Sequence, residues 1–442
     1  MKYSYPEDFA SFILDRLKGT SLLMNRQRAV DSGVAMGLPD LSVLEHLISV
    51  CYQASLLREE ERPVRFRVIL CEQECFDSEV GPPIGLQRLV FSHPRPFREL
   101  ELQRVSPAAN FYRSLVGVRV DDDGKLLIWG IIHSGPRWIQ TFYGGWETSP
   151  RLPLSLVIGV TGPGRITAGL GSNIIGSLNG GRILTPSLEV FDSRWMPESF
   201  TAIREDLWSR HMKDREGKSW ARLDQDFVRR IARQVLKRII SSVRNLQHGG
   251  TLLLLPPEMA SELLAENQYV TIKYPFIEEE PRQRFRTLML SIMKTLAEIY
   301  GRDMEPQRMV GWHEYITSKH ERLSFLKEAI FEMGHLIADL ASVDGAVVLT
   351  KQMEMLGFGG EISGKLDDVL KVKKALDADG ERTIWERTED VGTRHRSVYR
   401  LCNGIRHALA IVISQDGDVR FVKWKDGAVT HWDQVMTSVL DF

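Results

Sequence analysis

The sequence predicts a mixed α+β and α/β protein, in which a β-rich α+β domain is followed by a mixed sheet covered by helices. The first half alternates short apolar strands with glycine-rich turns, as in residues 154–170. The second half alternates amphipathic helices with continuous apolar runs such as 251–255, which are typical of strands buried on both faces. Residues 212–218 between them are polar and charged. We therefore expect two domains, 1–218 and 219–442.

The elements of the first domain follow from periodicity and turn chemistry. Residues 6–17 and 41–57 have helical spacing. Apolar and basic residues alternate over 64–70, which predicts a half-buried strand. The turn Asp121-Asp-Asp-Gly124 separates the apolar runs 115–120 and 125–132 and predicts a hairpin. Together with the strands around residues 154–184, these elements favour a domain rich in antiparallel sheet.

The second domain begins with an amphipathic helix over residues 227–246, which His248-Gly249-Gly250 ends. Its basic residues are expected to form a solvated face rather than a nucleic-acid surface; they are Arg229, Arg230, Arg233, Lys237 and Arg238. The elements that follow are strands 251–255 and 269–274, helices 285–300 and 322–340, the strand pair 346–350 and 355–362, helix 393–406, and a final hairpin of 408–414 and 419–423. A sheet with helices on both faces accounts for this order.

Composition limits the classes of function. The formal net charge is −1, so no overall field attracts nucleic acid or an anionic membrane, and neither is expected as a partner. The cysteines lack the spacing of a disulfide framework or a zinc site; they are Cys51, Cys71, Cys75 and Cys402. The N-terminus lacks the layout of a signal peptide, and no apolar run reaches the length of a membrane span. We expect a cytoplasmic protein.

Two short motifs in the second domain carry the chemistry. Asp344-Gly345-Ala346 places a carboxylate and a glycine between an apolar helix and an apolar strand. Gly392-Thr393-Arg394-His395-Arg396 places a hydroxyl, two guanidinium groups and an imidazole at the start of a helix. A carboxylate can hold a divalent cation, whereas arginines at a helix N-terminus favour phosphate groups. Together they are the parts that nucleotidyl transfer requires.

The order of these motifs resembles that of the diadenylate cyclase domain of the DisA type. The resemblance covers residues 220–440, and the five residues Gly392–Arg396 are identical to the signature of that family. It implies condensation of two ATP molecules to cyclic di-AMP with release of two pyrophosphates, with Mg²⁺ or Mn²⁺ as cofactor. The first domain is similar to the sensor domains that precede some of these cyclases, and would receive an unknown small-molecule or protein signal.

The resemblance also implies roles for individual residues. Asp344 is expected to bind the metal, and Arg394 and Arg396 the phosphates, while His395 would contact phosphate or metal. Thr393 is expected to cap the helix. The remaining nucleotide-binding residues implied by the motifs are Gly345, Ala346, Gly392 and Ser414. Because two nucleotides are joined symmetrically, the active form would be a homo-oligomer with facing sites.

One position departs from the family pattern. The family commonly has Ser-Glu after the strand that follows the arginine motif, and that glutamate helps to bind metal. This chain has Ser414-Gln415-Asp416 there, so that Gln415 and Asp416 are the remaining candidate ligands. A neutral amide is a poorer ligand than a carboxylate, and Asp416 also suits a turn with Gly417. The alternative to an active cyclase is therefore a degenerate nucleotide-binding module that senses and signals.

Overall fold

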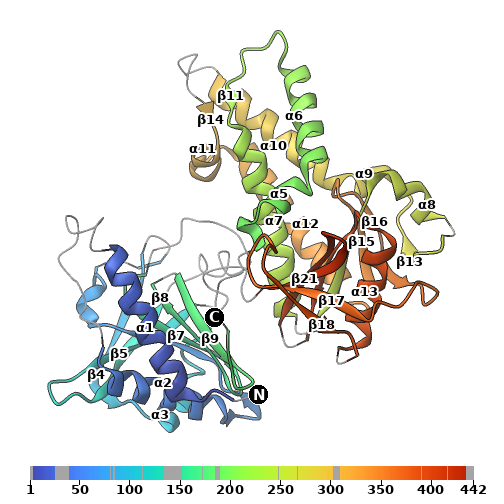
Figure 1. Cartoon of the computed structure of the whole chain (residues 1–442). Helices are drawn as coiled ribbons and strands as arrows, with labels where there is room; N and C mark the ends of the chain where they lie inside the picture. The colour runs from blue at the N-terminus through green and yellow to red at the C-terminus, as the bar shows by residue number, and fades with distance from the viewer. Residues whose placement is uncertain are drawn as a thin grey trace. The chain divides into compact units, whose positions relative to one another are not determined.

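The structure is a computed structural model, shown in Figure 1, and it describes residues 3–24, 39–79, 81–82, 85–111, 113–133, 152–171, 173–184, 190–246, 248–265, 267–301, 309–389, 391–415 and 417–434. The described residues fall into two compact units. The first comprises those up to residue 184, and the second those from residue 190 onward. Within the described part of the chain, no helix is long and apolar enough to cross a membrane.

The first unit is built on an eight-stranded sheet in the order β10-β9-β8-β7-β3-β5-β6-β4. Only the central pair β3 and β5 is parallel, as expected for a domain rich in antiparallel sheet. The strands are β3 (Phe66–Leu70), β4 (Gln87–Pro96), β5 (Ser114–Val120), β6 (Leu126–His133), β7 (Leu156–Gly162), β8 (Arg165–Leu170), β9 (Asn173–Asn179) and β10 (Arg182–Leu184). A small separate ladder joins β1 (Arg58–Glu59) and β2 (Arg62–Pro63).

Helices α1 (Pro6–Met24), α2 (Leu41–Ser55) and α3 (Glu99–Val105) belong to the first unit. Helices α1 and α2 pack through Ile13 and Leu47 on apolar side chains of the sheet such as Val68. The prediction of a half-buried strand over residues 64–70 is wrong. All five residues of β3 are buried, because β3 pairs with β5 on one edge and with β7 on the other, and both faces of the sheet are covered there. Arg67 stacks on Phe111 at 5.4 Å and donates to the main-chain oxygen of Ser114 at 3.3 Å.

The second unit is built on a nine-stranded mixed sheet in the order β13-β16-β15-β12-β19-β20-β21-β17-β18. The pairs β12–β15 and β17–β21 are parallel, and the others are antiparallel. The strands are β12 (Gly250–Leu255), β13 (Val270–Pro275), β15 (Ala346–Thr350), β16 (Met355–Ile362), β17 (Lys371–Ala375), β18 (Thr383–Arg387), β19 (Leu409–Ile413), β20 (Val419–Lys425) and β21 (Ala428–Gln434).

Helices cover both faces of this sheet, as predicted (Figure 1). On one face, α7 (Gln225–Asn245), α10 (Arg284–Gly301) and α12 (Glu321–Leu340) bury Ile239, Met289 and Ile337 in the same core as Leu254 of β12. On the other face, α13 (Thr393–Gly404) and α8 (Ala260–Leu264) bury Leu401 and Leu263 with Leu253. The shorter helices are α5 (Trp195–Glu198), α6 (Thr201–Arg215), α9 (Glu279–Arg282) and α11 (Trp312–Thr317), beside the two-stranded ladder of β11 (Arg222–Leu223) and β14 (Met309–Val310).

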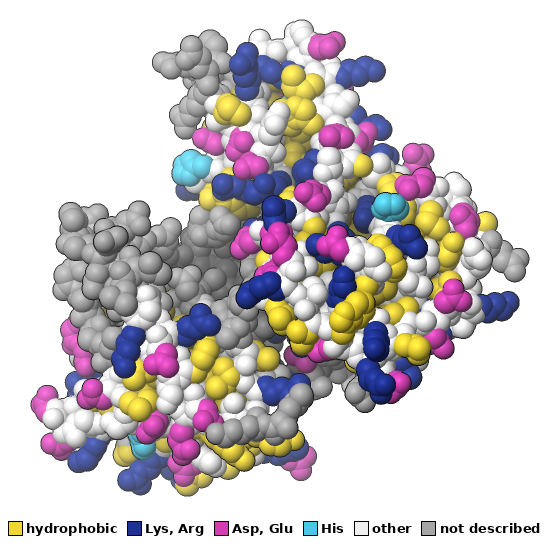
Figure 2. Space-filling view, viewed as in Figure 1, with side chains coloured by type: hydrophobic (Ala, Val, Ile, Leu, Met, Phe, Trp, Pro, Cys, Tyr) yellow, Lys and Arg dark blue, Asp and Glu magenta, His cyan; other side chains and the backbone are white. Residues whose placement is uncertain are grey.

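The compact units divide before residue 190, whereas the polar stretch in the sequence places a boundary near residue 218. The physical reason is α6, whose surface is mostly polar. It still buries Ile203 and Leu207 in the core of the second unit together with Phe285. The basic face of α7 is also not wholly solvated, since Arg238 is buried and lies 4.3 Å from the ring of Phe331. Figure 2 shows Lys and Arg side chains interspersed with Asp and Glu on the visible face of the described residues.

Candidate functional site at one end of the central strands

Three adjacent strands of the second unit bring the sequence motifs together. In the parallel pair β12–β15, Thr251 lies opposite Ala346, and in the antiparallel pair β12–β19, Gly250 lies opposite Ile413. Strands β12 and β15 begin at the same end of the sheet at which β19 finishes. The Asp344-Gly345 motif therefore lies at the same sheet end as Gly249-Gly250 and Ser414-Gln415, although these segments are far apart in the sequence.

Gly345 is required by the backbone at this end of the sheet. Its φ is +112°, a region that residues with a side chain rarely adopt. A Cβ there would lie 2.7 and 2.8 Å from the backbone carbon atoms of Gly359 on β16. The glycine thus lets two main-chain segments approach closely and turns the chain so that Asp344 emerges exposed next to the start of β15. Ala346, the first residue of β15, is buried in the sheet directly after this turn.

The arginine motif forms the first turn of α13, as predicted. Gly392 occupies the N-cap position with extended backbone, and the main-chain N–H groups of His395 and Arg396 donate to its oxygen. The expectation that Thr393 caps the helix is wrong, because Thr393 is already the first helical residue. No side chain of the described residues caps α13. The exposed start of the helix therefore keeps main-chain donors for a bound anion.

Arg394 reaches the junction of the other two segments. A Cβ on Gly249 would meet the Arg394 guanidinium at 3.0 Å, the main-chain nitrogen of Gln415 at 2.9 Å and the oxygen of Ile413 at 2.7 Å. The three groups thus surround one glycine, whose φ of +65° is also left-handed. Arg396 is exposed, as is Gln415. The structure therefore brings Arg394 and Gln415 together, and leaves their polar atoms accessible from solvent.

The carboxylate of Asp344 interacts electrostatically with Lys273 of β13. The pKa of Lys273 is raised chiefly by its hydrogen bond and ion pair with Glu361, at 2.5 Å, and also by the charge of Asp344. Within the described ranges, no three His, Cys, Asp or Glu side chains are grouped so that they could hold a metal ion. One exposed carboxylate fits a cation of the Mg²⁺ type, which usually takes one or two protein carboxylates and completes its shell with phosphate oxygens and water.

The turn after β19 holds the remaining predicted residues. The hydroxyl of Ser414 accepts a hydrogen bond from the main-chain N–H of Asp418 at 3.0 Å. The main-chain N–H of Ser414 donates in turn to the main-chain oxygen of Asp418 at 2.9 Å. The serine therefore shapes the turn. Asp416 lies outside the described residues. Arg244 of α7 donates from Nε to the oxygen of Gly417 at 2.9 Å, so the turn is held by the helix behind it.

His395 occupies a different environment from its two arginine neighbours. It is half-buried, and burial together with the nearby charge of Arg420 lowers its pKa to about 4. Asp433 and His431 also act on it electrostatically. The imidazole is therefore neutral at pH 7. The structure places His395 beside a polar cluster on strands β20 and β21, whereas the sequence predicts a contact with phosphate or metal.

This polar cluster was not apparent from the sequence. Arg420 donates to Asp433 at 2.6 Å and to the hydroxyl of Tyr399 at 2.7 Å. Lys374 also pairs with Asp433, at 3.0 Å, and fully buried His431 hydrogen-bonds Glu386 at 3.2 Å. Burial alone would raise the pKa of Asp433, but the close contact with His431, whose Nδ1 lies 3.5 Å away, and the charge of Arg420 outweigh it and hold that pKa far below its usual range.

The only available signal for the cluster was the alternation of Arg420, His431 and Asp433 with apolar residues along two neighbouring strands. Such alternation is also typical of a solvated face. In the structure, Tyr399 on the second turn of α13 is buried and covers Arg420. The cluster therefore anchors the buried side of α13, whereas Arg394 and Arg396 in its first turn are exposed.

Comparison with known proteins identifies part of the first unit. Residues 34–133 match the model of a family described as "Probable sensor domain DACNV". Such a sensor domain is found at the N-terminus of diadenylate cyclases. No curated protein and no solved structure matches the chain. The match extends over α2, α3 and the strands β3 to β6, so the prediction of an N-terminal sensor domain is confirmed.

Proposed function

We propose that this protein is a diadenylate cyclase whose activity is controlled by its N-terminal sensor domain. The observation that carries the proposal is the convergence of the Asp344-Gly345 turn with the arginine-bearing start of α13 at one end of the sheet. These segments are distant in the sequence, and each supplies a different requirement of nucleotidyl transfer. The sensor-domain match at residues 34–133 supports the same class of protein.

In this reaction the ribose 3′-hydroxyl of each ATP attacks the α-phosphorus of the other. Two phosphodiester bonds form, two pyrophosphates leave, and the two hydroxyl protons pass to solvent. No oxidant or reductant is needed. The protein has to align the hydroxyl with the phosphorus, and has to neutralise the charge that develops on the phosphate oxygens.

The exposed residues of the site divide these tasks. Arg394 and the free main-chain N–H groups of the first turn of α13 bind phosphate oxygens, and Arg396 supplies a second guanidinium. Asp344 would hold Mg²⁺ or Mn²⁺ together with the phosphates; the cation supplies charge neutralisation when bound. Gly345 and Gly249 let the backbone segments of the site approach one another closely at the strand ends, because neither carries a side chain.

A second function is favoured by one observation. The family glutamate is replaced by Gln415, and the described residues offer Asp344 without a group of further metal-binding side chains. The same site would then bind a nucleotide without turning it over. The protein would be a nucleotide sensor in a signalling or defence pathway.

The test is to incubate the purified full-length chain with ATP and Mg²⁺ or Mn²⁺, and to identify the products by mass. Cyclic di-AMP and pyrophosphate are expected from the wild type and not from Asp344→Asn, which should stay folded because Asp344 is exposed. ATP binding without any product from the wild type would favour the sensor module. Product formation undiminished in Asp344→Asn would overturn the assigned site.

A further inference from the structure

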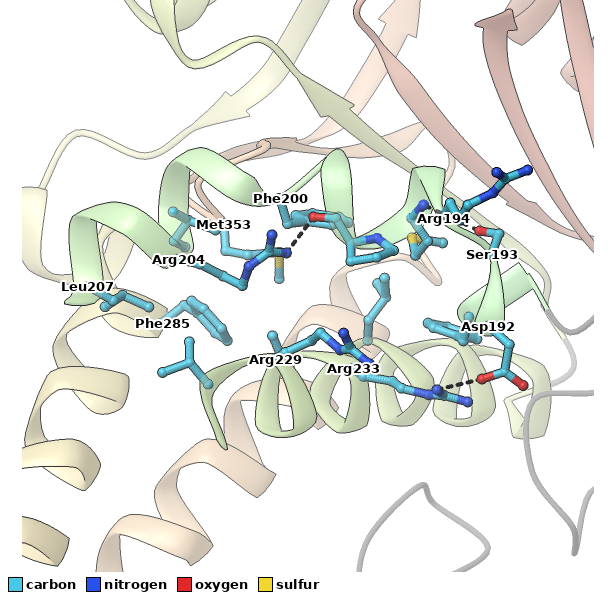
Figure 3. A pocket seen from close by; sticks show the side chains of 17 residues that line it. Asp192, Ser193, Arg194, Phe200, Arg204, Leu207, Arg229, Arg233, Phe285 and Met353 are labelled. Carbon is cyan, nitrogen blue, oxygen red and sulfur yellow. Dashed lines mark hydrogen bonds and ion pairs between the residues drawn. The ribbon is translucent and has the colours of Figure 1, made fainter. Parts of the chain in front are cut away.

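The second unit contains a cavity of about 320 Å³ on the face of the sheet opposite α13 (Figure 3). Its roof is the segment that includes α5 and α6, and its floor is the N-terminal half of α7. Apolar side chains form most of the lining; they include Phe191, Met196, Phe200, Ile203, Leu207 and Phe285. The cavity is separate from the site at the strand ends, and its residues have no role in the proposed reaction.

Four arginines line this apolar cavity, and two of them are neutralised within the protein. Arg194 pairs with Asp379 at 3.0 Å and also with Glu381. Arg233 pairs with Asp192 at 2.7 Å. Arg194 and Asp192, the partner of Arg233, lie at the same end of the cavity in Figure 3. The charges of Arg194 and Arg233 are therefore balanced by carboxylates of the protein itself.

The other two arginines, Arg204 and Arg229, belong to opposite walls. Arg204 of α6 donates to the main-chain oxygen of Pro197 and to the hydroxyl of Thr201 at 3.0 Å, which are neutral acceptors. Arg229 of α7 has Asp226 at 3.7 Å, with both side chains more than half exposed, so that ion pair is weak. Burial, and to a smaller extent the like charge of Arg229, lower the pKa of Arg204, whereas the charges of Glu205 and Asp226 act in the opposite direction.

We propose that this cavity binds a small molecule with an apolar body and one anionic head group. The apolar walls would take the body, and the head group would lie between Arg204 and Arg229, where it relieves their repulsion. A cavity of this size is in the range of small-ligand sites, which are mostly apolar with a few placed polar groups. The inference does not depend on the proposed cyclase activity.

The experiment uses the full-length chain and 8-anilinonaphthalene-1-sulfonate, a fluorescent anion with an apolar body. We expect saturable binding that weakens about tenfold in Arg229→Gln and in Arg204→Gln, from loss of a charge-assisted contact. Arg210→Gln is the matched control, since Arg210 is on α6 but pairs with Asp206 outside the cavity lining. Ala232→Phe, which fills the cavity, should abolish binding.

Displacement of the probe tests the charge requirement. Laurate and dodecyl phosphate should displace it at concentrations at least about tenfold lower than dodecanol, which has the same chain and no charge. The ratio between laurate and dodecyl phosphate then separates a carboxylate from a phosphate head group. Three results would overturn the proposal: no probe binding, equal affinity in all variants, or displacement by dodecanol as effective as by laurate.

Discussion

The Nε of Arg244, near the C-terminal end of α7, donates to the main-chain oxygen of Gly417 across 2.9 Å. This hydrogen bond connects the helical layer on one face of the sheet to the turn that carries Ser414 and Gln415. The same turn is closed internally, because the N–H of Gly417 donates to the oxygen of Ser414 at 3.0 Å. The position of Gln415 beside Arg394 therefore depends on α7 as well as on the strands.

Replacing Arg244 should loosen this turn without disrupting the fold. We expect Arg244→Met to lower the unfolding free energy by about 1 kcal/mol, as for one lost hydrogen bond. It should raise the KM for ATP several-fold more than it lowers kcat, because the turn is displaced but the reacting groups remain. Steady-state kinetics measure both. Arg230→Met, an exposed arginine of the same helix, is the control; kinetics equal to those of the control would show that the turn does not need this bond.

Gly345 should tolerate no side chain. Gly345→Ala places a Cβ 2.7 Å from the backbone of Gly359 and keeps a φ of +112°, so we expect a loss of about 2–4 kcal/mol of stability. Hydrogen exchange of the β15 amides, followed by mass spectrometry, measures this loss locally. Gly364→Ala is the matched control because a Cβ at Gly364 would have nothing within 4 Å and the backbone there is not left-handed. Equal protection of β15 in the two variants would contradict the close approach of the backbones.

The two exposed arginines of α13 should act on phosphate rather than on stability. Arg394→Ala or Arg396→Ala is expected to reduce ATP binding or turnover by a factor of about a hundred, which corresponds to about 3 kcal/mol of charge-assisted contacts. Lysine should restore little, because it lacks the planar fork. Arg387→Ala removes a comparably exposed arginine of β18 and is the control. Normal binding and turnover in both alanine variants would make the motif structural.

The reaction requires two sites that face each other, so activity should depend on protein concentration. One site holds one ATP, and symmetrical joining needs a second site across a two-fold axis. Specific activity should rise with enzyme concentration in the dilute range, and an excess of Asp344→Asn chains should reduce turnover per wild-type chain. Activity measured beside light scattering checks this. Constant specific activity from a monomer would exclude the face-to-face arrangement.

Long periodic segments of the second unit were predictable because local pattern and burial agree there. The helix predicted over residues 227–246 forms as α7, and the run 251–255 forms the central strand β12. The hairpins 346–362 and 408–423 also form as predicted. In each case, an apolar repeat or run has glycine or proline close to at least one of its ends, so a single interpretation fits the sequence.

Residues whose environment is set by distant partners were not predictable. The alternation in 64–70 indicated an exposed face for Arg67, which the sheet and Phe111 instead bury. Strands β17, β18 and β21 were missed because their mixed charged and apolar residues are stabilised by the cluster around Asp433, which forms only on folding. The same cluster acts electrostatically on half-buried His395, for which the sequence predicts a contact with phosphate or metal.

This half-buried position gives His395 a specific effect on stability. Burial comes first and the charge of Arg420 second in lowering its pKa to about 4, from about 6.5 in the unfolded chain. Because the folded-state pKa is lowered, the stability that depends on a neutral His395 is fully present above about pH 6.5. It is lost as the pH falls toward about 4, because the unfolded chain binds a proton at this residue over that range and the folded chain does not. The lowered pKa of Asp433 contributes stability that is fully present above about pH 4, so Asp433 changes the unfolding free energy with pH only below that value.

We therefore expect the unfolding free energy of the wild type to fall more steeply between pH 6.5 and pH 4 than that of His395→Gln, which carries no titrating ring. Urea titrations at a series of pH values measure the two slopes, and the difference between them removes the contribution of every other histidine. Arg394, Arg420, His431 and Asp433 are unchanged in the variant and serve as a constant background. Parallel pH profiles would mean that His395 is as accessible to protons in the folded protein as in the unfolded chain, and that α13 is not anchored through its inner face.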